Sequence, residues 1–269
     1  MTSSRVFAIR SIAVACVILA FTLAASLGLA AATPGNAYAG SKTTIYVVSK
    51  AVHKSGDYEF TNTYTYKNGL LTTTKTALKH DGSVSNSANT YIYNSKNALQ
   101  RSVVKSAGKT QSTTTYQTNS KGWVTKMTVK YPGVSQKNTY KLAYKNGKLS
   151  KSSTSVSTTT YKYYDDGNLK SLTTKYDTDS YTISLKYDKK GFVKKRITTS
   201  GNYKNAYTFK NTYKSGRLAK QVSMLNNKVD ETTTYTYKRV SIPKSLAKMV
   251  QAQQTSIVKS GVPFEAAHK

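Results

Sequence analysis

The sequence predicts an all-β protein, a meander of antiparallel β-hairpin repeats with about 14 to 16 strands and a C-terminal capping helix. Three observations support this fold class. Tyrosine and threonine, which favour strands, are abundant, and tyrosine alone occurs 22 times. Glycine and asparagine recur at nearly constant spacing, as hairpin turns require. Between these turns, apolar and polar residues alternate with the period of a strand.

Residues 1–39 are predicted to be a signal peptide that is removed on export. Arg5 and Arg10 precede an uninterrupted apolar stretch, 12–32, and Ala37-Tyr38-Ala39 supplies the small-x-small pattern at which a signal peptidase cuts. The alternative is a retained transmembrane anchor, because about 20 apolar residues can span a bilayer. The helix-breaking residues before the cleavage pattern favour removal, which would leave no permanent membrane span.

The single cysteine, Cys16, lies inside the apolar stretch. The processed chain therefore has no cysteine, which excludes disulfides and thiolate metal sites. An exported chain without cysteine is typical of a bacterial secreted or cell-surface protein.

A repeat domain is predicted over residues 40–241. Seven segments share a tyrosine, a short turn, and then leucine or valine two places after the turn residue. The tyrosines are Tyr66, Tyr93, Tyr116, Tyr144, Tyr164, Tyr187 and Tyr213. The turn residues are Gly69, Asn97, Gly122, Gly147, Gly167, Gly191 and Gly216. By subtraction they lie 28, 25, 25, 20, 24 and 25 positions apart, which indicates an array of one supersecondary unit.

A second set of turn signals lies about midway between these turns and includes Asp81-Gly82, Gly108, Pro132-Gly133 and Asn226-Asn227. The segment 181–187 shows the alternation between turns, with Tyr, Ile, Leu and Tyr at the odd positions. One face of the sheet is therefore expected to be buried and the other covered by Lys, Thr and Ser. A sheet this wide must curl into a spiral, close like a barrel or fold over on itself, and periodicity does not distinguish these shapes.

Residues 242–269 are predicted to form an amphipathic helix and a tail. Pro243 suits a helix start. From Lys244 to Val258, apolar or amide residues recur at three- and four-residue intervals, at Leu246, Met249, Val250, Gln253 and Ile257. We expect this helix to plug the open end of the sheet, and a membrane-surface helix is the alternative.

Two units resemble the tyrosine-aspartate (YD) repeat of bacterial Rhs and teneurin-like proteins. They are 161–169, which reads Tyr-Lys-Tyr-Tyr-Asp-Asp-Gly-Asn-Leu, and 187–193, which reads Tyr-Asp-Lys-Lys-Gly-Phe-Val. The resemblance covers roughly residues 58–240. It implies hairpins that wind into a β-shell, and carbohydrate binding has been attributed to some members of the family. The other units lack the aspartate, so the resemblance supports the hairpins rather than encapsulation.

The charge of the chain predicts its partners. Removal of residues 1–39 takes away two arginines and no acids, so 39 basic and 11 acidic side chains remain, a net charge of +28. Such a charge favours anionic polymers and membrane surfaces. Only four of the remaining cations are arginine. Specific nucleic-acid recognition is not expected, because reading guanine and phosphate prefers the guanidinium group.

The acidic residues do not predict a catalytic site. The close pairs are Asp165-Asp166, Asp177-Thr-Asp179 and Asp230-Glu231. A glycosidase needs two carboxylates in one cleft, whereas Asp165 and Asp166 lie in a predicted turn, where aspartate accepts hydrogen bonds from local backbone N–H groups. Asp177 and Asp179 lack the later ligands of a calcium loop.

The remaining candidates also point away from catalysis. His53, His80 and His268 are too far apart to suggest a metal triad, and no phosphate loop or nucleophile elbow is present. We therefore expect no catalytic residues, no metal and no cofactor. Trp123, the only tryptophan, could stack on a sugar ligand, but packing against a neighbouring hairpin is the preferred interpretation.

These observations predict a non-catalytic, exported, cationic repeat protein with a binding or structural role at the bacterial cell surface or cell wall. The expected partner is an anionic polysaccharide or wall polymer. One alternative is a nonspecific nucleic-acid or membrane-surface binder, and the other is a glycan-active enzyme.

Overall fold

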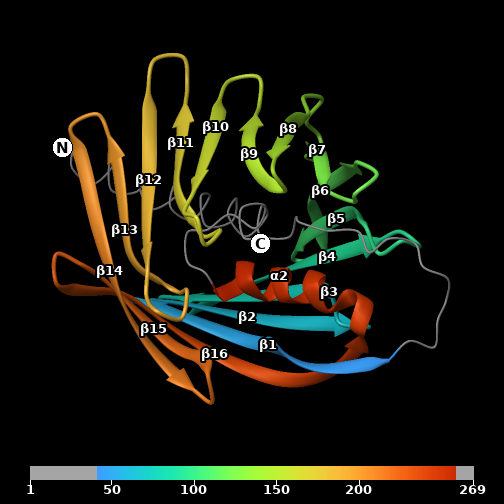
Figure 1. The fold of residues 1–269 in the computed structure, drawn as a ribbon, viewed down its shortest axis with the longest axis horizontal. Helices are drawn as coiled ribbons and strands as arrows, with labels where there is room; N and C mark the ends of the chain where they lie inside the picture. Colours follow the sequence, from blue (N-terminus) through green and yellow to red (C-terminus); the bar gives the residue numbers. More distant parts are fainter. Residues whose placement is uncertain (1–40, 259–269) are drawn as a thin grey trace.

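The computed structural model describes residues 41–258 and shows a sixteen-stranded antiparallel barrel with one short helix (Figure 1). Each strand pairs with its neighbours in the chain, and β1 pairs with β16 to close the barrel. The predicted signal peptide, the tail beyond Val258 and His268 lie outside the described residues.

The strands are joined by short turns throughout. Their bounds are β1 Lys42–Ser55, β2 Tyr58–Lys67, β3 Leu70–His80, β4 Ser83–Tyr93, β5 Leu99–Ser106, β6 Lys109–Thr118, β7 Val124–Lys130, β8 Asn138–Lys145, β9 Lys148–Ser153, β10 Thr158–Tyr163, β11 Leu169–Lys175, β12 Ser180–Tyr187, β13 Val193–Ser200, β14 Tyr203–Lys214, β15 Arg217–Leu225 and β16 Lys228–Pro243.

The all-β antiparallel meander is confirmed, and the closed barrel decides among the three shapes that the sequence left open. Closure removes both free edges of the sheet, so no row of unpaired backbone groups remains along the outermost strands. The first and last strands are also among the longest, and their pairing runs from Lys42 opposite Pro243 to Lys54 opposite Thr232.

A ring of buried leucine and valine residues lies inside one end of the barrel. Each member stands two places after a predicted turn residue, and each is at most 5% exposed. The ring consists of Leu71, Leu99, Val124, Leu149, Leu169, Val193 and Leu218. An extra residue follows each member and forms a β-bulge, such as Thr72 after Leu71 and Ser150 after Leu149. Bulges increase local twist and bend the strand, which helps a sheet to curl.

The turns at this end use residues that tolerate positive φ. In the shortest hairpins, Asn68 and Gly69 have φ of 51° and 82°, as a two-residue turn requires. Gly69 is also required by packing, because a Cβ atom there would collide with the side chain of Ile242.

The C-terminal helix is confirmed and follows β16 directly. A single 3₁₀ turn, Lys244–Leu246, leads into α2, Ala247–Val258. Leu246, Met249 and Val250 are buried in one apolar cluster with five members of the ring, whereas Leu169 and Val193 belong to a second cluster. The helix contacts β1 and β3 and lies along the inner side of the wall (Figure 1). The sequence predicts a helix that plugs an open end of the sheet. In the closed barrel no edge strand is left free for the helix to cover.

Candidate functional site

The seven predicted turn residues all lie in turns at one end of the barrel. They connect β2 to β3, β4 to β5, and so on to β14 and β15, and all seven have positive φ. Longer members of the set are stabilised by an asparagine or aspartate at the first turn position. Asn94, Asn119 and Asp188 each accept hydrogen bonds from the backbone N–H groups two and four residues later.

Four of the predicted repeat tyrosines tie one strand to another. Tyr66, Tyr93, Tyr144 and Tyr187 donate their hydroxyl groups to backbone carbonyls 18 to 22 residues earlier in the chain, at distances of 2.7–2.9 Å. For Tyr93, Tyr144 and Tyr187 the acceptor is a member of the leucine and valine ring. The tyrosines therefore belong to the barrel wall rather than to a ligand site.

The other three repeat tyrosines are placed differently. Thr118 stands opposite Val124, and Tyr116 lies two residues before Thr118. The hydroxyl group of Tyr116 contacts the hydroxyl group of Ser102. In the fifth unit Tyr163 stands opposite Leu169, whereas Tyr164 lies one residue later, in the turn, and donates to the carbonyl of Leu185. Tyr213 donates to the carboxylate of Asp188 on the preceding hairpin.

Trp123 packs against the neighbouring hairpin. The centroid of its ring lies 5.1 Å from that of Tyr144. A Cβ atom at Gly147 would lie 3.8 Å from the indole ring of Trp123. Lys121 lies 5.2 Å from the Trp123 ring centroid, at the distance of a cation–π contact. These contacts account for the position of the tryptophan without a ligand.

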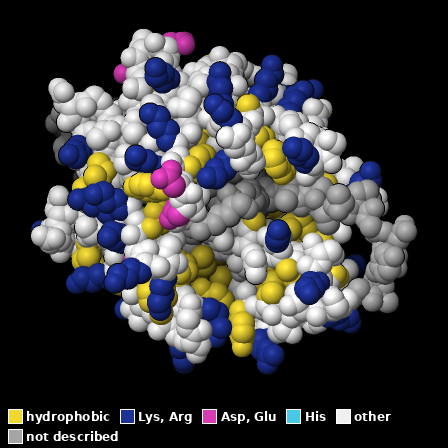
Figure 2. All heavy atoms as spheres, in the orientation of Figure 1, with side chains coloured by type: hydrophobic (Ala, Val, Ile, Leu, Met, Phe, Trp, Pro, Cys, Tyr) yellow, Lys and Arg dark blue, Asp and Glu magenta, His cyan; other side chains and the backbone are white. Residues whose placement is uncertain are grey.

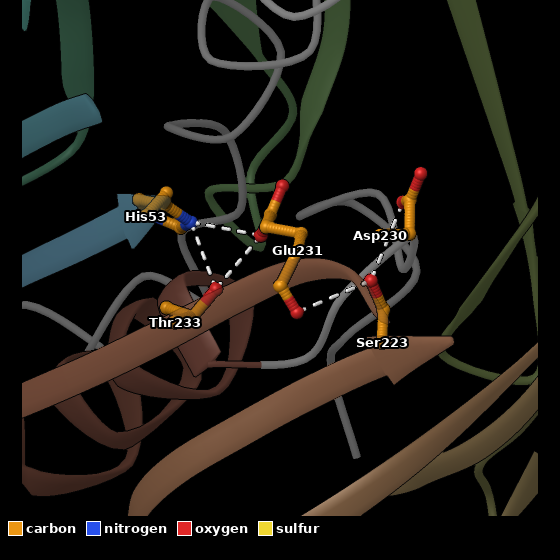
Figure 3. Close-up of polar contacts among 5 residues, drawn as sticks. All are labelled: His53, Ser223, Asp230, Glu231 and Thr233. Carbon is orange, nitrogen blue, oxygen red and sulfur yellow. Dashed lines mark hydrogen bonds and ion pairs between the residues drawn. The ribbon is translucent and has the colours of Figure 1, made fainter. Parts of the chain in front are cut away.

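A polar cluster spans the seam between the first and last strands (Figure 3). His53 on β1 lies 3.2 Å from Glu231 and 3.0 Å from Thr233, both on β16. Thr233 also donates to Glu231 at 2.7 Å. Burial by itself would raise the pKa of Glu231, but hydrogen bonds from His53 and Thr233 and the charge of Arg196 together hold that pKa below its ordinary value.

The geometry of this cluster does not support a nucleophilic triad. A triad needs the hydroxyl group and the carboxylate on opposite nitrogens of the imidazole, whereas Thr233 and Glu231 both contact Nδ1 of His53. Ser223 contacts Asp230 at 3.4 Å and the carbonyl of Glu231 at 3.5 Å, and neither described histidine lies among its hydrogen-bond partners. Sequence reasoning missed this cluster, since only barrel closure brings residue 53 beside residue 231.

The other acidic pairs lie in turns. Asp166 accepts hydrogen bonds from both the backbone and the side chain of Asn168, and the carbonyl of Asp179 closes the β11–β12 turn by accepting from Tyr176. His80 stacks on Tyr58, with 3.9 Å between ring centroids. Within residues 41–258, no group of three or more potential metal ligands of the His, Cys, Asp and Glu types is present.

The outer wall carries most of the lysines. Lysines project outward, whereas threonines lie on both sides of the wall, since Thr114, Thr174 and Thr233 are buried. Figure 2 shows lysine and arginine spread over the visible face, with few carboxylates. Three pairs of lysines stand directly opposite each other on neighbouring strands: Lys126 and Lys141, Lys145 and Lys148, and Lys186 and Lys195. Like charges in this position repel. Over residues 41–258, one lysine, Lys54, forms an ion pair with a carboxylate, that of Glu59 at 2.9 Å.

Comparison with known proteins supports the barrel fold alone. No protein-family model and no curated protein matches the chain. A porin-like protein from Bacteroides uniformis has a similar fold, with a TM-score of 0.55 and 16% sequence identity, and the match covers 71% of this chain and 98% of that protein. This degree of identity makes the likeness one of architecture.

Weaker similarity extends to components of Tc toxins. The TcdB2–TccC3 complex matches with a TM-score of 0.31 and 12% identity over 62% of this chain and 12% of that one. The Photorhabdus luminescens Tc holotoxin pore gives 0.30 and 11%, over 68% and 15%. These scores are too low to assign the chain to a family. In the described part of the chain, no helix is long and apolar enough to cross a membrane.

Proposed function

We propose that this chain is an exported, non-catalytic binding protein of the bacterial cell envelope that holds anionic polymers on its outer wall. The observation that carries the proposal is the set of outward lysines without a carboxylate partner among residues 41–258, including the three like-charge cross-strand pairs. A bound polyanion would reduce the repulsion within these pairs. Its binding would therefore also stabilise the folded chain.

The composition of the outer wall supports contact with water and a charged polymer. On β14, for example, Lys204, Lys210 and Lys214 face outward, whereas Tyr207 and Phe209 face inward. Strands that face lipid show the reverse arrangement, with apolar residues outward. The porin-like likeness therefore supports the barrel and not a porin's surroundings.

The test is binding of the processed chain to a teichoic acid and to an uncharged glucan across a salt series. We expect measurable affinity for the teichoic acid and none for the glucan. The affinity should fall steeply with salt, because screening lengths drop to about 8 Å at physiological ionic strength.

Two results would contradict this proposal. Retention of the teichoic acid that does not change with salt would exclude an electrostatic surface. Equal binding to the uncharged glucan would show that the lysines do not determine the choice of partner.

A further inference from the structure

One row of residues crosses the outer wall of strands β1 to β5. The register places Lys50 on β1 opposite Thr63 on β2, Thr63 opposite Lys75 on β3, Lys75 opposite Ala88 on β4, and Ala88 opposite Lys105 on β5. All three lysines are exposed. Charged and small residues therefore alternate along a line perpendicular to the strands.

The next row along the strands carries no charge. It runs from Val52 through Thr61 and Ala77 to Asn86. A groove of about 490 Å³ lies over the part of these two rows from β2 to β5 and is lined by Thr61, Thr63, Lys75, Thr76, Ala77, Asn86, Ser87, Ala88, Lys105, Ala107 and Gly108. Small side chains leave the floor low, and the long side chains of Lys75 and Lys105 bound the groove on one side. Lys50 lies beyond the lining, on β1.

The opposite side of the groove has a different charge balance. The third row runs from Lys54 through Glu59 to Lys79. Glu59 forms an ion pair with Lys54, so the charge of Lys54 is locally balanced. The lysines at 50, 75 and 105 have no carboxylate partner among the described residues, which makes the first row the cationic side.

The spacing of these lysines favours a polymer with well-separated charges. Neighbouring strands lie about 4.8 Å apart, so lysines on every second strand are about 10 Å apart at their backbone positions. A nucleic acid strand carries one phosphate every 3.4 Å or so along the helix axis, which is much denser. A glycan with an acidic group on alternate sugars has a sparser pattern that suits the row.

We propose that this groove binds a linear acidic polysaccharide that extends past the groove onto β1, with its carboxylates or sulfates on the row of Lys50, Lys75 and Lys105. The alanine and threonine methyl groups of the floor would contact the C–H face of the sugar rings. Thr63 and Asn86 offer hydroxyl and amide groups to the sugar hydroxyls. This assignment rests on the proposed polyanion binding and gives it a location and a ligand class.

The experiment compares two triple variants of the full chain that lose the same charge. The row variant is Lys50→Gln, Lys75→Gln and Lys105→Gln. The control variant is Lys130→Gln, Lys151→Gln and Lys175→Gln, three exposed lysines on β7, β9 and β11 that belong to none of the like-charge pairs. Binding of hyaluronate, which carries one carboxylate per disaccharide, and of polyphosphate is measured by calorimetry, after circular dichroism melting has shown that each variant is folded.

We expect the row variant to bind hyaluronate about tenfold more weakly, since three exposed charge contacts are lost. The control variant should change this affinity by less than about twofold. A further variant, Ala88→Gln, raises the groove floor without changing the charge, and it should weaken hyaluronate binding while leaving polyphosphate binding unchanged.

The possible failures are distinguishable. Equal losses in the row and control variants would overturn the groove and leave a diffuse polyanion surface. Binding of the wild-type chain to polyphosphate but not to hyaluronate would also overturn the groove alone. Absence of binding to every polyanion would overturn both the groove and the proposed function.

Discussion

Gln253 on helix α2 and Tyr93 on β4 are joined by a hydrogen bond of 3.1 Å, and together they satisfy both backbone groups of Leu71. The N–H group of Leu71 donates to the side-chain oxygen of Gln253, and its carbonyl accepts the Tyr93 hydroxyl. Gln254 and Tyr66 form the same arrangement around Val48. Two consecutive glutamines therefore anchor the helix to the backbone at two bulged strands.

Replacement of Gln253 by alanine should lower the free energy of unfolding by about 2 kcal/mol, because the buried N–H group of Leu71 would lose its partner. Gln251 on the exposed side of the same helix is the matched control, and its replacement by alanine should change stability by less than about 0.5 kcal/mol. Urea unfolding of both variants is the measurement. Equal effects would show that Gln253 contributes only helix propensity.

The tyrosine hydroxyl contacts are open to a simple deletion test. Tyr144→Phe removes the hydrogen bond of 2.9 Å to the carbonyl of Val124 and keeps the ring. We expect a loss of about 1 kcal/mol in the free energy of unfolding. Tyr131→Phe is the control, because this exposed tyrosine lies in the β7–β8 connection, and it should have almost no effect. A neutral Tyr144→Phe would mean that water replaces the hydroxyl at no cost.

Local sequence patterns predicted much of the fold. The spacing of Gly and Asn located the turns, because positive φ restricts the residues allowed there, and apolar periodicity located the helix up to Val258. Barrel closure was not predictable, since β1 lacks the tyrosine-turn unit and its partner β16 lies at the far end of the chain. Periodicity carries no information about which distant strands pair.

The candidate sites were less predictable than the strands. Tyr163 and Tyr164 are adjacent, and the number of residues in the turn decides which of them stands opposite Leu169. The amino-acid composition does not determine that number. The cross-strand lysine pairs and the row through Lys75 depend on register, which the bulges shift by one residue in most hairpins. The abundance of lysine predicted an anionic partner but not where lysines would align.

Asp188 joins two hairpins through its two carboxylate oxygens. Oδ1 accepts from the backbone of Lys190 and Phe192, and Oδ2 accepts from Asn211 and Tyr213. Asp188→Ala should therefore cost about 2 kcal/mol or more in the free energy of unfolding. Asp188→Asn can keep the turn contacts and loses an acceptor for the neighbouring hairpin, so it should fall between the wild type and Asp188→Ala. Identical losses in both variants would show that the contacts with the neighbouring hairpin account for the whole effect, and an Asp188→Asn variant as stable as the wild type would show that the turn alone matters.

The same carboxylate predicts a dependence on acid. Burial by itself would raise the pKa of Asp188, but the hydrogen bonds from Tyr213, Asn211 and the two backbone N–H groups together lower that pKa below its ordinary value of 3.8. The stabilisation it provides is complete above this ordinary value and is lost as the pH falls through the lower folded-state pKa. Below pH 3.8, the wild type should therefore lose more of its unfolding free energy than Asp188→Asn, measured by urea unfolding at each pH. Parallel losses would contradict an ionised Asp188.

Alkaline pH should unfold the barrel through its buried tyrosines. Burial raises the pKa of Tyr237 from 10 to about 12, and burial also raises the pKa of Tyr64, Tyr66 and Tyr93. The neutral form is favoured in the folded state, so stability is complete below pH 10 and declines as the pH rises toward the folded-state values. Tyrosinate absorbance and loss of strand signal in circular dichroism should change together. Full ionisation of the tyrosines with the barrel intact would contradict their burial.

The like-charge pairs on the outer wall predict that removing a cation stabilises the protein. Lys186 and Lys195 stand directly opposite on β12 and β13. Replacement of Lys195 by glutamate turns repulsion into attraction and should raise the free energy of unfolding by about 0.5–1 kcal/mol at low salt. Lys195→Gln removes only the repulsion and should give roughly half of that gain. Both gains should shrink at about 1 M salt, where the screening length is near 3 Å. A gain that persists at high salt would point to a change in strand propensity, and a loss at low salt would show that the lysines at 186 and 195 do not repel each other across the strands.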